Sequence, residues 1–147
     1  MFRNDGSYRV YFAAVDDDNG SGYANVTVTV DNVPPTVTAE ADPVDVQAGE
    51  TLALSGTLQD PGIDDVYQVD IGWGDGLSDV LDLPAGTQAW GATHVYSRDA
   101  AGANTIQVQV SDGVDTTRID VPVTVTAVGP DAAFTFAPAE PVERQSV

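Results

Sequence analysis

Apolar and polar residues alternate at every second position over much of the chain, which is the pattern of β-strands that bury one face. In residues 105–111, for example, isoleucine and valine alternate with threonine, glutamine and serine. Valine and threonine also suit the pleated surface of a strand. The pattern predicts an all-β chain with nine strands, at residues 8–15, 23–30, 36–41, 51–58, 66–73, 79–83, 93–96, 105–111 and 118–126.

Turn-forming sequences separate the predicted strands. Glycine, proline and aspartate, which tolerate or favour turn dihedrals, cluster between them. Pro122 lies inside the last predicted strand and has no amide hydrogen, so we expect that strand to follow a sheet edge or to leave position 122 unpaired. The main turn sequences are Asp60-Pro61-Gly62, Gly74-Asp75-Gly76, Pro84-Ala85-Gly86 and Asp112-Gly113.

The sequence contains an internal repeat. Residues 6–12 match residues 102–108, and the valines at 26, 28 and 30 match those at 121, 123 and 125. The offset of about 95 residues is longer than a solenoid unit and suits a β-sandwich domain. We therefore predict three parts: the C-terminal part of one module (1–32), a complete module (33–127) and the start of a third (128–147).

The charge balance excludes several functions. The chain of 147 residues carries 23 acidic and 5 basic side chains, for a net charge of -18, and no lysine. Such a chain is repelled by nucleic acid, whose phosphates are bound by lysine and arginine. There is no cysteine for disulfides or thiolate chemistry, and no apolar run approaches the ~20 residues that span a bilayer. We expect no nucleic-acid partner and no membrane insertion. The acidic balance also suits a high-salt source.

Several motifs resemble those of bacterial PKD (polycystic kidney disease) domains. They are the turn Trp73-Gly74-Asp75-Gly76, the sequence His94-Val95-Tyr96 followed by Gly102 and a strand, the loop Asp60-Pro61-Gly62, and the linker at 31–37. The resemblance implies an immunoglobulin-like β-sandwich that is non-catalytic and occurs in tandem on secreted and cell-surface proteins. Asn104, where the family usually has tyrosine, and Ile71-Gly72 depart from the pattern and affect packing rather than assignment.

The residues that could carry catalysis have a structural interpretation. His94 is the only histidine, lies in a predicted strand beside Tyr96, and has no Gly-x-Ser-x-Gly elbow to serve. Trp73 continues an apolar strand face, so we expect it in the core, with Asp75 in the turn that follows. Trp90, in a stretch rich in glycine and alanine, could be buried or form a surface contact. We therefore expect no enzyme activity.

Calcium is the ligand that the sequence favours. In an immunoglobulin-like sandwich the linker, the loop at 60–65 and the last hairpin gather at one end. Ca²⁺ takes six to eight oxygens from such irregular sets, and a site here would stiffen the joint between modules. The opposing interpretation is that these residues cap turns and stay hydrated. The candidate ligands are Asp31, Asn32, Asp60, Asp64, Asp65, Asp112 and Asp115.

A second acidic loop is excluded as an EF-hand. The sequence Asp17-x-Asn19-x-Ser21-Gly22 has the opening spacing of a calcium loop, but the twelfth position is Val28 instead of glutamate and no helices flank it.

These observations predict a spacer or adhesive module of a large extracellular or cell-surface protein, in contact with neighbouring modules of the same chain. One alternative is a module that binds polysaccharide or protein through Trp90, Tyr11 or Tyr67; another is an accessory domain of a secreted hydrolase. We also expect the apolar head face, with Phe12 and Val26, to pair with a tail strand containing Phe134 and Phe136, giving a homo-oligomer.

Overall fold

The computed structural model describes residues 2–129, which form ten β-strands and one short 3₁₀ helix, η1. No helix in this part of the chain is long and apolar enough to cross a bilayer. The elements are β1 (Gly6–Val15), β2 (Ser21–Val30), β3 (Thr36–Asp42), β4 (Asp45–Gln47), β5 (Thr51–Gln59), β6 (Tyr67–Gly72), β7 (Ser78–Leu83), β8 (Ala89–Val95), η1 (Arg98–Ala100), β9 (Gly102–Ser111) and β10 (Thr116–Thr126).

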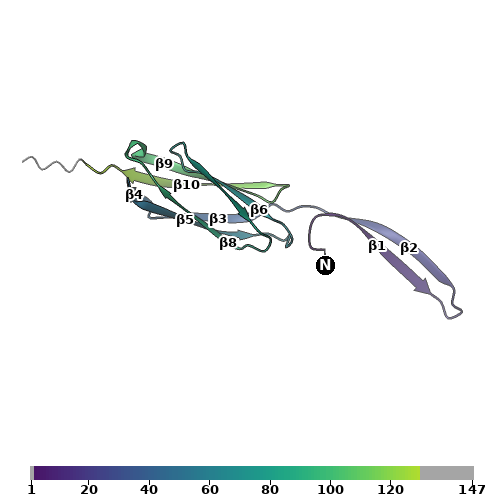
Figure 1. The fold of residues 1–147 in the computed structure, drawn as a ribbon. Helices are drawn as coiled ribbons and strands as arrows, with labels where there is room; N and C mark the ends of the chain where they lie inside the picture. The colour runs from purple at the N-terminus through teal and green to yellow at the C-terminus, as the bar shows by residue number, and fades with distance from the viewer. Residues whose placement is uncertain (1, 130–147) are drawn as a thin grey trace, which may run out of the picture.

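Strands β3 to β10 form a β-sandwich (Figure 1). One sheet has the order β3-β5-β8 and the other has the order β4-β10-β9-β6-β7. All neighbouring strands are antiparallel except β4 and β10, which pair in parallel. The chain therefore has the all-β, immunoglobulin-like fold that the alternation and the motifs predict.

The core lies between the two sheets and is built from the alternating positions of the strands. In β5, exposed residues alternate with residues that point into the core, from the exposed Thr51 to the exposed Gln59. Trp73 is completely buried, as predicted, and belongs to the apolar core. The largest fully buried side chains are Trp73, Tyr96, Leu52, Leu54, Leu58, Ile71 and Ile106.

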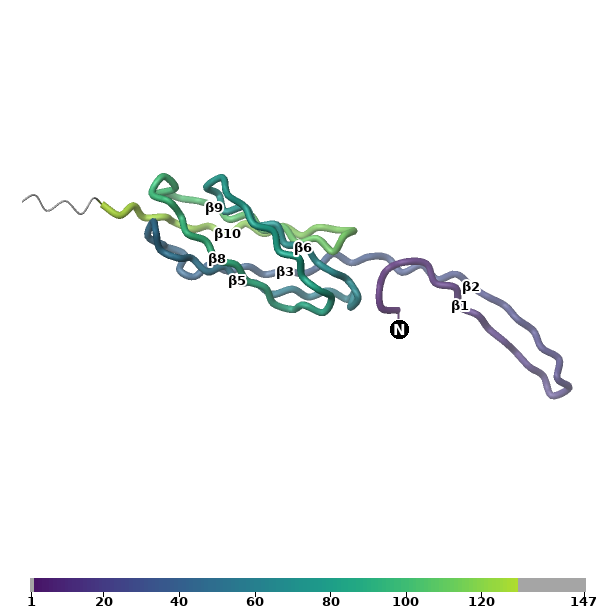
Figure 2. Tube along the Cα trace, in the orientation of Figure 1, coloured from purple at the N-terminus to yellow at the C-terminus, as the bar shows by residue number. Residues whose placement is uncertain are grey.

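Strands β1 and β2 form a separate hairpin that extends beyond one end of the sandwich (Figure 2). Its register equals that of β9 and β10: Val10 pairs with Val26, as Ile106 pairs with Val121. Gly6 and Gly102, which match in the repeat, both have a φ near +127° that favours glycine. The hairpin therefore has the geometry of the last two strands of a module.

Most strands begin and end within a few residues of the prediction, but two differ. β4 is missing from the predicted set because three residues give too short an alternation, and β8 begins at Ala89, four residues before the predicted start, inside the glycine- and alanine-rich stretch. β4 reaches only Thr124–Thr126, so Pro122 has no β4 partner on that side and the sheet tolerates the missing amide.

The hairpin exposes part of the predicted head face. Phe12 and Val26 are exposed, whereas Tyr8, Val10 and Val28 are half-buried. The tail strand with Phe134 and Phe136, and most of the third predicted part, lie outside the described residues.

Candidate functional site

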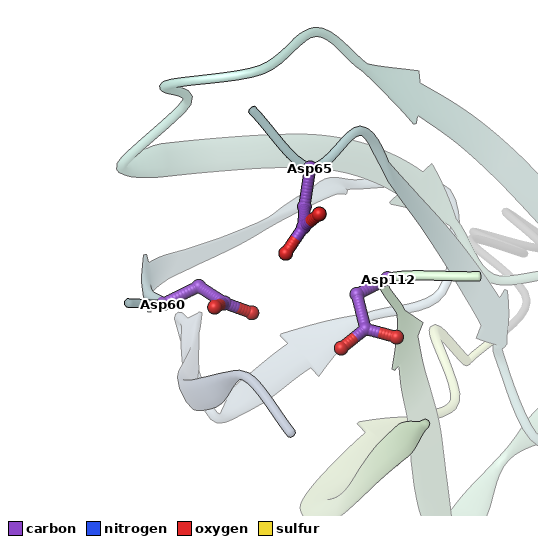
Figure 3. A group of neighbouring side chains, drawn as sticks. All are labelled: Asp60, Asp65 and Asp112. Atoms are coloured by element: carbon purple, nitrogen blue, oxygen red, sulfur yellow. The ribbon is translucent and has the colours of Figure 1, made fainter. Parts of the chain in front are cut away.

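Three aspartates converge at the end of the sandwich that faces the hairpin. Asp60 and Asp65 lie on the loop between β5 and β6, and Asp112 follows β9. Each offers one carboxylate oxygen, and these oxygens lie within 4.8 Å of one another. Figure 3 shows the carboxylates entering a shared space from three directions. We call these three residues the aspartate cluster.

Local turn chemistry fixes two members of the cluster. The Gly62 amide donates to Asp60 Oδ1 at 2.7 Å. The amides of Val114 and Asp115 donate to Asp112 Oδ1 at 2.8 and 2.7 Å, so this carboxylate closes its own turn. In both residues the local bonds occupy Oδ1; Asp112 Oδ2 accepts a hydrogen bond from the Asn32 side-chain amide at 2.9 Å.

Burial leaves acidic oxygens without partners. Asp65 is only 8% exposed, and its Oδ2 is covered and has no hydrogen-bond partner within the described residues. Asp60 Oδ2 is in the same state. A buried carboxylate oxygen without a donor costs free energy, because it has lost its water and gained nothing in return. The geometry therefore calls for a positively charged occupant or a proton.

The cluster changes the ionisation of its own members. Burial raises the pKa of Asp65, and the charges of Asp60 and Asp112 add to the rise, while the nearby Asn4 amide opposes it. For Asp112, burial also acts upward, but hydrogen bonds from Asn32 and from the turn amides outweigh it, and the net pKa is lowered. Burial and the three acidic charges raise the pKa of Tyr67 to about 12.

The local charge is unbalanced. Among residues 2–129, the ion pairs of arginine join Arg3 to Asp64 and Arg118 to Asp120, and His94 contacts Asp75; none of these contacts reaches the aspartate cluster. Ca²⁺ binds oxygen at about 2.3–2.6 Å, so two ligands on opposite sides of one ion lie about 4.8 Å apart. The spacing, the oxygen-only donor set and the irregular loops all fit this ion.

The other predicted ligands lie around the cluster. The Asn32 side-chain amide donates to Asp112 and to Asp115, at 2.9 Å in each case, and so ties the linker to the last hairpin. Asp31 is exposed and lines a neighbouring cleft. Asp64 is half-exposed and lies 3.7 Å from Arg3. Asp31 and Asp64 therefore lie outside the cluster, and the structure brings together Asp60, Asp65 and Asp112.

His94 has a structural environment. Its Nε2 lies 2.8 Å from Asp75 Oδ2. Its ring stacks on the Trp73 ring, with centroids 4.6 Å apart and an angle of 7° between the planes, and it packs edge-to-face with the Tyr96 ring. Burial pushes the pKa of Asp75 upward, but the hydrogen bonds from His94 and from the Leu77 amide outweigh it, so the net pKa is lowered. Asp75 thus joins the turn to the core, a link that period-two reasoning did not give.

Two of the three rings considered as a binding surface are buried in the part of the chain that the structure describes. Trp90 packs against Gly56, where an added Cβ would overlap its ring, and is 7% exposed; Tyr67 is also buried. Tyr11 is 71% exposed and Tyr23, on the facing strand, is 81% exposed. Binding through three rings of one sheet is therefore wrong for Trp90 and Tyr67, because both complete the core.

The acidic loop of the hairpin is an ordinary turn. Asn19 has a φ of 65°, and Asp16 Oδ1 accepts a hydrogen bond from the Gly20 amide at 2.6 Å. This turn lies at the end of the hairpin farthest from the sandwich (Figure 1). It caps a hairpin and is remote from the aspartate cluster.

Comparison with known proteins supports the fold. No family model and no curated protein matches the sequence. Among solved structures, the chain is similar to the PKD domain of an M14-like peptidase from a Thermoplasmatales archaeon, with 21% identity, a TM-score of 0.52, and coverage of 65% of this chain and 97% of that one. An amphioxus IgVJ-C2 molecule is 18% identical with a TM-score of 0.48, covering 82% of this chain and 60% of that one. The fold is that of a PKD or immunoglobulin-like domain.

Proposed function

From a sandwich with the fold of a PKD domain, we propose that the chain is a non-catalytic spacer within an exported or cell-surface protein, and that Ca²⁺ held by the aspartate cluster stiffens the joint at its N-terminal end. The single observation that carries the calcium proposal is the cluster itself: three carboxylates share one space, and buried oxygens of Asp60 and Asp65 have no partner.

The rest of the molecule supports a mechanical role. The only histidine is held between Trp73 and Tyr96 and paired with Asp75, which leaves it no nucleophile to activate. The similar PKD domain comes from a peptidase, which favours an accessory position beside other domains. A spacer needs a stable sandwich and a joint of defined stiffness. Calcium at extracellular concentrations would supply the stiffness of the joint.

Calorimetric titration of CaCl₂ into EGTA-stripped, desalted protein tests the metal site. We expect one ion per chain with a Kd of about 10⁻⁴–10⁻³ M, the range of extracellular modules. Mg²⁺ should bind more weakly, because it demands a compact octahedral set that these loops do not supply.

Two variants define the result. Asp112→Asn removes a cluster carboxylate and should abolish the heat of binding, whereas Asp17→Asn, an exposed acid at the far hairpin turn, should leave it unchanged. No calcium heat in the wild-type protein, or equal loss in both variants, would show that the acids act only as hydrated turn residues.

A further inference from the structure

The segment before β1 crosses to the loop that carries Asp60 and Asp65. The Ile63 amide donates to the Arg3 carbonyl at 3.1 Å, and the Arg3 guanidinium lies 3.7 Å from the Asp64 carboxylate. Between this segment, the linker and Pro61-Gly62 lies a cleft of about 200 Å³. The hairpin and the sandwich therefore meet at the loop that bears two of the three cluster acids.

Asn4 projects an oxygen to the same place. Its Oδ1 is covered and has no hydrogen-bond partner within the described residues. A Cβ placed on Gly62 would lie 3.1 Å from Asn4 Oδ1 and would collide with Asp65 Oδ2, so both oxygens occupy the space beside this glycine. The Asn4 side-chain amide also favours the charged form of Asp65 and so opposes the rise in the pKa of that acid, which places Asn4 at the edge of the aspartate cluster.

The backbone holds Asn4 in this position. The Tyr8 hydroxyl donates to the Asn4 carbonyl at 2.8 Å, and the Phe2 ring packs on the Tyr8 ring with centroids 4.5 Å apart. Tyr8 is in β1, so the position of Asn4 is coupled to the hairpin, while the neighbouring residue Arg3 contacts the sandwich loop. An amide oxygen is a common neutral ligand of Ca²⁺.

We propose that Asn4 is a ligand from the opposite side of the joint, so that one calcium ion is held jointly by the hairpin module and the sandwich. This proposal rests on the calcium site proposed above and adds its regulation: ion binding and docking of the two modules become one coupled equilibrium. Asn32, which joins the linker to Asp112, orders the sandwich side of the same joint. Asn4 could not be identified from the sequence, because it lies outside every turn motif and 56 residues before Asp60.

Affinity measurements on the full chain test this assignment. We expect Asn4→Ala to weaken calcium binding about 10-fold or more, and Asn4→Asp to retain it, because a carboxylate supplies an oxygen at the same place. Asn25→Ala, which removes an exposed asparagine on β2, is the matched control and should bind as the wild type does. Unchanged melting of the sandwich in EGTA shows that each variant is folded.

Amide hydrogen exchange measures directly whether calcium binding is coupled to docking of the hairpin on the sandwich. The Ile63 amide is bonded to Arg3 across the joint, so calcium should slow its exchange in the wild type and in Asn4→Asp but not in Asn4→Ala. If the wild type binds calcium and Asn4→Ala binds it equally well, the ion is held by the sandwich alone and the shared site is overturned, while the proposed spacer stands. If the wild type binds no calcium, the proposed calcium site and its sharing with Asn4 are both overturned.

Discussion

Replacing Trp73 with alanine lowers the free energy of unfolding by about 3–5 kcal/mol, the usual cost of removing a fully buried tryptophan. Its ring is completely buried and stacks on His94. Its Nε1 donates to Asp79 at 2.8 Å, and its carbonyl accepts from the Tyr96 hydroxyl at 2.9 Å. The substitution therefore opens a cavity and loosens the neighbouring turn.

Urea unfolding followed by circular dichroism measures this loss, and for a domain of this size the melting temperature should fall by about 12 °C or more. Leu77→Ala in the same turn is the control: Leu77 is exposed, so we expect a change within about 0.5 kcal/mol. A similar small change in Trp73→Ala would mean that the tryptophan does not anchor the core.

The second large effect is that of Asp65→Asn on thermal stability, which we expect to be opposite in the presence and in the absence of calcium. Saturating calcium, at a hundred times its Kd, should stabilise the wild type by about 2.7 kcal/mol and raise its Tm by about 10 °C. Asp65→Asn should abolish that rise and yet melt higher than the wild type in EGTA. The reason is the raised pKa of Asp65: the folded state prefers the protonated acid, so the charged acid costs stability at neutral pH, and this cost disappears as the pH falls.

Thermal melts with EGTA, CaCl₂ and MgCl₂ at fixed ionic strength check both the loss of the calcium-induced rise in Tm and the higher Tm in EGTA. Asp64→Asn is the matched control, because Asp64 is adjacent in sequence but lies outside the cluster beside Arg3. It should keep the calcium shift. A full shift in Asp65→Asn would remove Asp65 from the site.

The fold was predictable because the alternation is strong where burial is one-sided. Residues 105–111 read as a half-buried strand from the sequence, and β9 has that pattern of exposure. Trp73 follows the same argument. The position of Trp90 did not follow, because its burial depends on Gly56, a residue of another strand that leaves room for the ring. β4 was missed because it forms by pairing with β10, which is distant in sequence, and three residues are too few to show an alternation.

The site was predictable only in part, for a related reason. Topology gathers the loops at one end of the sandwich, and this places Asp60, Asp65 and Asp112 together. Which acids turn inward depends on the local hydrogen bonds of each turn: the same loop directs Asp65 into the cluster and Asp64 toward Arg3. Asn4 required the docking of two separate segments, which no local pattern contains.

The central claim, that calcium stiffens the joint between the hairpin and the sandwich, is tested most directly by a distance distribution across it. The chain has no cysteine, so spin labels at Asp18→Cys on the hairpin turn and Ser55→Cys on the outer face of β5 report only the intended pair. We predict a broad distribution in EGTA that narrows in CaCl₂, and no narrowing when Asp65→Asn is added. Equal widths with and without calcium, in protein shown to bind the ion, would contradict the account.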